Sequence, residues 1–429
     1  MSRLEAIAAP DHRLSTALAS LTAALAPAYV IRWHLGFYPT TLLEVAILAT
    51  ITVFAMESWR AGSIPEWRSP LVLPAAIFLV AGALSVLVAP SSLAALGLYR
   101  AYLVEPVLFG LVLVAVLRLP GRAHLVVAGF WVGGAVLGVA NIVAVLRVIA
   151  SHTFRTEGTP PVAIYSVANA VALFLVPLVA VAGSLLLYER RRPVRVTALV
   201  FLAIAVPAVV LTFSRGGWLA LAAVAIGLAV SHPRRLWLLA ALLATALTLG
   251  LVPAIRQRAL FDLRFNSGES LNGRVRLWSG TVEMLRHRPI TGAGLGGFTD
   301  RMGATFKNPF QITPIFPHNI VLNFWSELGL LGLLAFGWIV VATALAAWRG
   351  WRRGAPEWRP LQLGVMLALL AVVVHGLVDV PYFKNDLALE FWGLVAVPWA
   401  AWRWAAAQGA VETRAPFSPP MSQSPGRTP

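Results

Sequence analysis

Long apolar runs alternate along this chain with short polar or charged connections. The runs are roughly 18 to 25 residues long, which is the length that an α-helix needs to cross a hydrocarbon core about 30 Å thick. The pattern therefore predicts an all-α integral membrane protein with about twelve transmembrane helices. The predicted spans are residues 14–31, 39–57, 70–89, 99–117, 123–149, 163–187, 195–212, 216–231, 236–253, 319–347, 361–380 and 387–405.

Two segments fall outside these spans. Residues 254–318 form a long connection rich in charged residues, and residues 406–429 are rich in Pro and Ser, a composition typical of disorder. The chain is 59% hydrophobic and only 12% charged, whereas soluble domains are about 25% charged. We expect one polytopic transmembrane domain over residues 1–405, which includes the loop 254–318, followed by a disordered cytoplasmic tail over residues 406–429.

The basic residues predict the orientation of the chain. Nineteen of the 34 lie near the two ends and in alternate short connections, and such residues favour the cytoplasmic side. With twelve spans, this distribution places both termini in the cytoplasm and the loop 254–318 on the opposite side. That loop still carries nine basic residues, so we expect these charges to have a function. They are Arg256, Arg258, Arg264, Arg274, Arg276, Arg286, Arg288, Arg301 and Lys307.

Composition also limits the chemistry. No cysteine is present, which excludes disulfides, zinc–cysteine sites and thiolate nucleophiles. The acidic residues of the long loop are widely spaced, and nothing among them resembles a Mg²⁺ site. An anionic leaving group would then be stabilised by arginine, whose planar fork suits phosphate. We expect no metal, no cofactor and no nucleic-acid partner.

The run FSRGGW (213–218) falls at the break between two predicted spans. Its glycine pair permits a tight turn, and the N-terminus of the following helix favours an anion. Arg215 is therefore a candidate ligand for a phosphate group. The alternative is an arginine that reaches the lipid headgroups beside an interfacial Trp.

A second motif, GRVRLW (273–278), opens a segment in which apolar residues recur at helical spacing. This periodicity predicts an amphipathic helix that lies on the membrane surface. One interpretation is that Arg274 or Arg276 faces inward onto a diphosphate. The other is a basic helix that only contacts anionic lipid.

Two further motifs close the loop. The glycine-rich run PITGAGLGGF (289–298) follows a helix rather than a strand, which favours a tight connector over a nucleotide-binding loop. The run PHN (317–319) lies where the loop re-enters the membrane. An imidazole there can take a proton from a sugar hydroxyl near neutral pH, so His318 is a candidate general base. The alternative is a structural histidine.

Ionisable residues near the predicted spans gather towards their outer ends, which favours a site at the outer interface. His375 and Asp379 are four residues apart, and their spacing indicates a hydrogen-bonded pair at a helix end or a supporting role. Arg100 is expected to be neutralised by Glu105. The candidates for supporting roles are Asn319, Glu327, Arg155 and His375.

The motifs S-R-G-G-W, then G-R-x-R-L-W with P-x-x-G-x-G-x-G-x-F, then P-H-N with E-L-G-x-x-G occur in this order over about residues 213–332. Together they resemble the O-antigen ligase family of bacterial membrane glycosyltransferases, which groups O-antigen ligases, repeat-unit polymerases and protein O-oligosaccharyltransferases. The resemblance implies a GT-C-like helical fold with a large periplasmic loop that contains short helices.

The resemblance also implies a reaction. The donor would be a glycan on a polyprenyl (undecaprenyl) diphosphate, and the acceptor a hydroxyl of a glycolipid or glycan at the outer face of the bacterial cytoplasmic membrane. Arg215, Arg274 and Arg276 match the family arginines that bind the diphosphate, and His318 matches the histidine that activates the acceptor. The family chemistry is inverting and independent of metal.

Two other functions fit parts of the pattern. A repeat-unit polymerase would use the same chemistry with a second lipid-linked glycan as acceptor. A flippase or exporter for lipid-linked sugars belongs to a different class, and it would place charged residues near the membrane midplane. The gathering of charges at the outer ends counts against that class.

Overall fold

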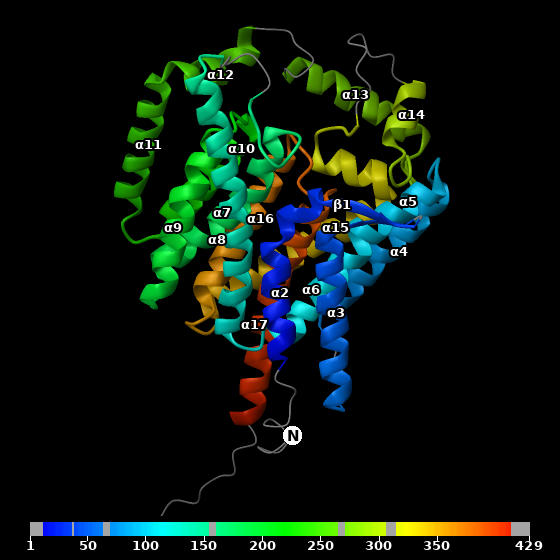
Figure 1. The fold of residues 1–429 in the computed structure, drawn as a ribbon, viewed down its shortest axis with the longest axis vertical. Helices are drawn as coiled ribbons and strands as arrows, with labels where there is room; N and C mark the ends of the chain where they lie inside the picture. Colours follow the sequence, from blue (N-terminus) through cyan, green and yellow to red (C-terminus); the bar gives the residue numbers. More distant parts are fainter. Residues whose placement is uncertain are drawn as a thin grey trace, which may run out of the picture.

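The computed structural model describes residues 12–36, 38–62, 69–153, 160–264, 271–305 and 315–412. Within these residues the chain is a bundle of long helices with one short β-hairpin (Figure 1). This confirms the predicted all-α architecture. The helices are α2 (Arg13–Ala24), α3 (Leu42–Arg60), α4 (Val72–Val88), α5 (Ser92–Tyr99), the π-helical turn η2 (Arg100–Val104), α6 (Glu105–Val116), α7 (Pro120–Ala150), α8 (Ala168–Tyr188), α9 (Arg192–Val210), α10 (Arg215–Ser231), α11 (Arg235–Leu251), α12 (Pro253–Arg264), α13 (Leu271–His287), α14 (Phe298–Thr305), α15 (Ile320–Arg353), α16 (Arg359–Gly376) and α17 (Asn385–Glu412).

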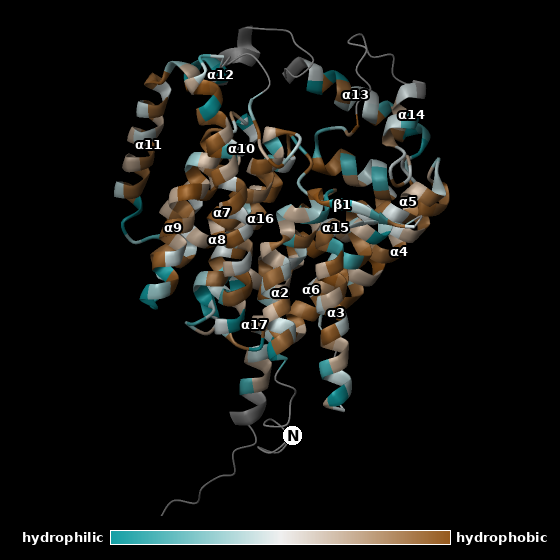
Figure 2. Ribbon diagram, in the orientation of Figure 1, coloured by the Kyte–Doolittle hydropathy of each residue, from teal (hydrophilic) through white to brown (hydrophobic). Residues whose placement is uncertain are grey.

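Seven helical segments of the described chain are long and apolar enough to cross a membrane. They are α3, the continuous run α5–η2–α6, α7, α8, α9, α15 and α16. The helices α4, α10 and α11 are apolar but shorter. Figure 2 shows hydrophobic residues over the body of the bundle and more hydrophilic ones at its two ends. These findings fit a membrane protein, and the count of twelve spans stays a prediction.

The first predicted span, residues 14–31, is not one helix. The helix α2 has 12 residues, so it rises only about 18 Å. A 3₁₀ turn, η1 (Ala26–Val30), with Pro27 near its start ends the helical run. The chain then forms an antiparallel hairpin of β1 (Arg32–Leu35) and β2 (Tyr38–Thr41), in which Arg32 pairs with Thr41. The apolar pattern did not reveal this hairpin.

The helix α15, which the pattern predicts as one span over residues 319–347, is interrupted at Gly329. This residue has φ 68° and ψ −175°, a conformation essentially restricted to glycine. A Cβ at Gly329 would lie 2.3 Å from the carbonyl oxygen of Ile290. The break therefore lets the chain before α14 approach the backbone of α15.

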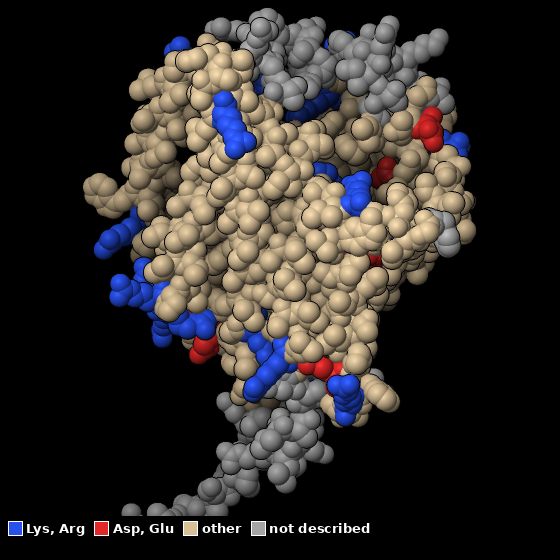
Figure 3. Space-filling model, viewed as in Figure 1, with Lys and Arg blue, Asp and Glu red and all other residues tan. Residues whose placement is uncertain are grey.

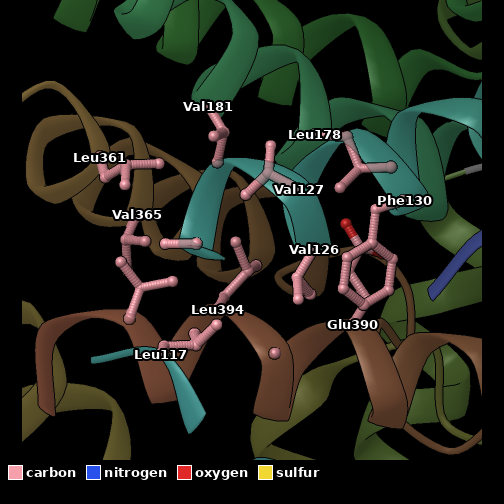
Figure 4. A pocket seen from close by; sticks show the side chains of 13 residues that line it. Leu117, Val126, Val127, Phe130, Leu178, Val181, Leu361, Val365, Glu390 and Leu394 are labelled. Carbon is pink, nitrogen blue, oxygen red and sulfur yellow. The ribbon is translucent and has the colours of Figure 1, made fainter. Parts of the chain in front are cut away.

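The helix α8 lies at the centre of the bundle. Nearly all its residues are buried, and it packs against α9, α10 and α16. A small cavity nearby is lined mainly by apolar side chains of α7, α8, α16 and α17, with the carboxyl of Glu390 at its edge (Figure 4). Its volume is about 20 Å³, which is room for one water molecule. A cavity of this size is too small for a sugar ring.

The predicted loop 254–318 contains three short helices. The helices α12, α13 and α14 lie at one end of the bundle, and the start of α2 lies at the other (Figure 1). Figure 3 shows Lys and Arg at the end nearer the start of α2 and others towards the opposite end, with a broad band without charged residues between them. Helix α17 continues to Glu412, so the predicted tail does not begin at residue 406. Residues 413–429 lie outside the described residues.

Candidate active site

The site begins at the N-terminus of α15, where His318 precedes the helix. His318 has φ 48°, in the left-handed region. Asn319 caps the helix, because its Oδ1 accepts hydrogen bonds from the backbone N–H groups of Val321 and Leu322 at 3.0 and 3.1 Å. Its Nδ2 donates to the carbonyl oxygen of Leu377 at 3.1 Å. Asn319 thus joins the start of α15 to the segment that follows α16, and it fixes the backbone beside His318.

His318 pairs with Asp379. The distance from His318 Nδ1 to Asp379 Oδ1 is 3.3 Å. The same carboxylate accepts hydrogen bonds from Asn169 Nδ2 at 3.0 Å and from the N–H of Val380 at 2.9 Å. The side chain of His318 is 38% exposed while that of Asp379 is only 9% exposed. The buried aspartate therefore holds the imidazole of His318 in place, and the imidazole itself is accessible at the surface of the site.

Asp379 is held in its ionised form. Burial alone would raise the pKa of this carboxyl, but the hydrogen bond and charge of His318, the charge of His375 and the Val380 amide lower the pKa to about 2. An ionised carboxylate can only accept, so the hydrogen bond assigns the proton of His318 to Nδ1. Nε2 is then the nitrogen that can take a proton from a substrate.

This arrangement corrects one sequence prediction. The spacing of His375 and Asp379 indicated a hydrogen-bonded pair at a helix end or a supporting role. The pair is not formed as expected, because α16 ends at Gly376 and the Asp379 carboxylate accepts hydrogen bonds from His318, Asn169 and Val380. The supporting role of His375 stays a prediction. His375 is 2% exposed and lies against the turn that carries Arg215. A Cβ at Gly216 would be 2.8 Å from the ring carbon Cδ2 of His375, so only glycine allows this close approach.

Arg215 is the first residue of α10. The chain turns at Phe213, which has φ 52°, and Ser214 caps the helix by accepting a hydrogen bond from the N–H of Gly217 at 3.2 Å. Arg215 is half-buried. The turn therefore places Arg215 at a helix N-terminus, one residue before the Gly216 backbone that His375 approaches, where backbone N–H groups also favour an anion.

The amphipathic helix predicted from GRVRLW is α13, and one hydrogen bond ties it to the histidine motif. The indole Nε1 of Trp278 donates to the carbonyl oxygen of Pro317 at 2.9 Å. Arg274 lies one turn earlier on the same face, and its charge acts on His375. Arg276 is exposed, and two residues along a helix place it on the opposite face. The structure thus brings Arg274, rather than Arg276, toward His318.

Arg258 is a residue of this region that the sequence did not single out. It lies on α12 and is only 9% exposed, and its Nε donates to the carbonyl oxygen of Phe213 at 3.3 Å. Phe213 forms the turn before Arg215. The hydrogen bond from Arg258 on α12 therefore holds that turn in place. The only signal for it was the excess of basic residues in the loop.

Glu327 contacts the glycine-rich connector. Its Oε2 accepts a hydrogen bond from the N–H of Gly296 at 2.5 Å. The N–H of Ala293 donates to the carbonyl oxygen of Ser326 at 2.7 Å, and the N–H of Leu330 donates to that of Ile290 at 2.9 Å. The glycine-rich run is therefore a tight connector that packs on the interrupted α15, and the contact of Glu327 supports the connector.

Other predicted residues lie farther from His318 or outside the description. Arg155 lies outside the described residues. Arg100 bonds Glu105 at 3.1 Å, as predicted, and also Glu44 at 2.9 Å. Within the described ranges, no three His, Asp or Glu side chains come together in a way that could hold a metal ion. A metal-independent mechanism stays a prediction.

The comparisons with known proteins agree with the motifs. The family model described as O-antigen ligase matches residues 200–337. The match runs from within α9 to the first half of α15, and so it contains Arg215, Arg274 and His318 but not Asp379. No curated protein sequence matches the chain. The predicted resemblance to the O-antigen ligase family is confirmed.

Proposed function

We propose that this protein transfers a glycan from a polyprenyl diphosphate carrier to an acceptor hydroxyl. The reaction takes place at the outer face of the bacterial cytoplasmic membrane, and both termini are cytoplasmic. A glycolipid or another glycan carries the acceptor hydroxyl. The proposal rests on the pairing of His318 with the buried Asp379. Beside this pair, a hydrogen bond from Trp278 to Pro317 joins the N-terminal side of α15 to α13, the helix that carries Arg274.

The chemistry follows from the assigned proton positions. His318 donates through Nδ1 to Asp379, so its Nε2 removes the proton of the acceptor hydroxyl. The hydroxyl oxygen forms a bond to the anomeric carbon, from the face opposite the leaving group. The bond from that carbon to the diphosphate oxygen breaks, and its electron pair leaves with the polyprenyl diphosphate. Asp379 stabilises the imidazolium that forms.

Arginine charges stabilise the leaving group. Arg215 at the start of α10 and Arg274 on α13 bind the diphosphate, whereas Arg276, which the family motif also matches, is exposed on the opposite face of α13. Bidentate arginine–phosphate hydrogen bonds are about twice as strong as neutral ones. Since these donors are in place before the bond breaks, they act on the charge that develops in the transition state.

The test is a purified assay with an isolated polyprenyl-diphosphate glycan and candidate acceptors. His318→Ala is expected to abolish transfer while binding of the donor persists. Arg215→Ala and Arg274→Ala are expected to weaken donor binding, and Lys at either position is expected to rescue it only in part, because the planar fork is lost. Full activity of the His318→Ala variant would overturn the role of the histidine.

The product identifies the acceptor. Glycan that moves to a lipid or cell-surface acceptor indicates a ligase, whereas a longer polymer on the polyprenyl carrier indicates a repeat-unit polymerase. Transport of the intact lipid-linked glycan across vesicles without transfer would instead indicate a flippase.

A further inference from the structure

An open groove runs along the surface between α10, α15 and α16, away from the candidate active site. Its volume is about 530 Å³, within the range of sites for small ligands. On α10 the lining begins at Ala223, eight residues beyond Arg215, and ends at Ser231. On α16 it covers residues 363–370, whereas His375 lies nearer the opposite end of that helix. The groove therefore lies along the halves of α10 and α16 that are remote from Arg215 and His375.

The groove is apolar along its length and polar at one end. Its walls are Ala, Ile, Val, Leu and Met side chains, while Trp348, Trp351 and Arg352 line the end near the C-terminus of α15. Trp348 is 50% exposed. Indole rings gather at the headgroup level of membranes, where one part of the ring is apolar and another is wet. This end of the groove is therefore at a membrane–water boundary.

Basic residues surround the same end. Arg349, Arg352 and Arg353 lie in the last turns of α15 and are exposed, and Arg234 and Arg235 follow the end of α10. The C-terminal dipole of α15 corresponds to only about half a negative charge, so it does not balance three arginines. Within the described residues, no ion pair to Arg352 is formed. The mouth of the groove thus carries a net positive charge.

We propose that this groove binds a phospholipid with an anionic headgroup, from the leaflet opposite the long loop. One acyl chain lies along the apolar walls between α10 and α16, and the phosphate and its anionic headgroup contact Arg352 between the two indoles. The positive mouth, the boundary position and the apolar channel together match this one class of ligand. The site is separate from the proposed diphosphate site, because the two occupy opposite ends of α10.

The test is native mass spectrometry of the full chain in mild detergent, with phosphatidylglycerol and phosphatidylcholine of identical acyl chains added at equal concentration. The protein is expected to retain phosphatidylglycerol in preference. Arg352→Gln should lower its retention about fivefold, the size expected for one basic residue at a membrane surface. Arg352→Lys should retain most of the preference. Ala223→Leu, which fills the groove, should lower retention of both lipids.

The matched control is Arg353→Gln. Arg353 is an exposed neighbour on the same helix end but does not line the groove, so its loss should change retention little. Equal retention of the two lipids by the wild type, or equal losses in the Arg352 and Arg353 variants, would overturn the proposal. Displacement of bound phosphatidylglycerol by polyprenyl phosphate would also overturn it, since the groove would then hold the carrier chain.

Discussion

Asp379→Asn is the substitution that tests the active site most directly. Asparagine keeps the shape of the side chain but removes the negative charge that faces His318. The aspartate accepts three hydrogen bonds, from His318, Asn169 and Val380. The amide oxygen of the new asparagine can keep the hydrogen bond from the Val380 N–H, and Asn169 can turn its own amide to accept from the new NH2 group, so the variant should fold with the residue in place. The effect should therefore appear in the rate of transfer.

The expected loss can be worked from the geometry. Opposite charges about 4 Å apart at an effective dielectric constant of about 20 attract by about 4 kcal/mol. His318 is 38% exposed, so solvent screening reduces this to about 2 kcal/mol. That energy stabilises the imidazolium formed in the transition state, and its loss corresponds to about thirtyfold in rate.

The assay measures kcat and the KM for the lipid-linked donor separately, with the melting temperature as a check on folding. The variant should lower kcat and leave the donor KM nearly unchanged. Asn169→Ala is the control, because it removes one hydrogen bond from the same carboxylate but keeps the charge, and it should cost only a few-fold. A variant Asp379→Asn with kcat within threefold of wild type would refute the assigned role, as would an equal loss in Asn169→Ala.

Three further outcomes are expected. Because the pKa of Asp379 is low in the folded protein, its ionised carboxylate stabilises the fold by on the order of 2 kcal/mol at pH values above its ordinary pKa. This stabilisation is lost as the pH falls towards 2. Thermal melts of Asp379→Asn should lack this loss between about pH 4 and 2. Gly329→Ala should destabilise the fold by about 3 kcal/mol or more, from backbone strain and the clash with Ile290, whereas Gly337→Ala, in open space on the same helix, should not. Trp278→Phe removes the hydrogen bond to Pro317 and should lower transfer severalfold with little change in melting temperature, and unchanged transfer would contradict a positioning role.

The sequence predicted the local features of the site. The turn at FSRGGW, the amphipathic helix α13 and the start of α15 near His318 all follow from turn residues and helical periodicity, which are properties of a few neighbouring residues. The break at Gly329 escaped this reasoning, because glycine is common in transmembrane helices and interrupts no apolar pattern. The hairpin of β1 and β2 escaped it because four-residue strands carry little periodicity.

Long-range pairings could not be predicted in the same way. The spacing of His375 and Asp379 suggested a helical pair, but the end of α16 at Gly376 leaves Asp379 in a connecting segment. There it meets His318, which is 61 residues earlier in the chain. Arg258 is another case, since nine basic residues share the loop and no local pattern says which of them is buried against Phe213.

The contacts around the loop explain how the site is organised before substrate binds. Apolar side chains of α13, the connector and α14 form a small separate core: Met284, Leu285, Ala293, Phe298 and Met302. This core is joined to α15 by the connector's backbone hydrogen bonds and by the contact of Gly296 with Glu327. The hydrogen bond from Trp278 to Pro317 then fixes α13 at a second point. Because two separate attachments set the register of α13 against α15, we expect Arg274 and His318 of the proposed site to keep their spacing without a ligand. Stabilisation of the leaving group by such preorganised charges costs no reorganisation during the reaction. An arginine on a freely moving loop could bind the diphosphate but would not give this advantage.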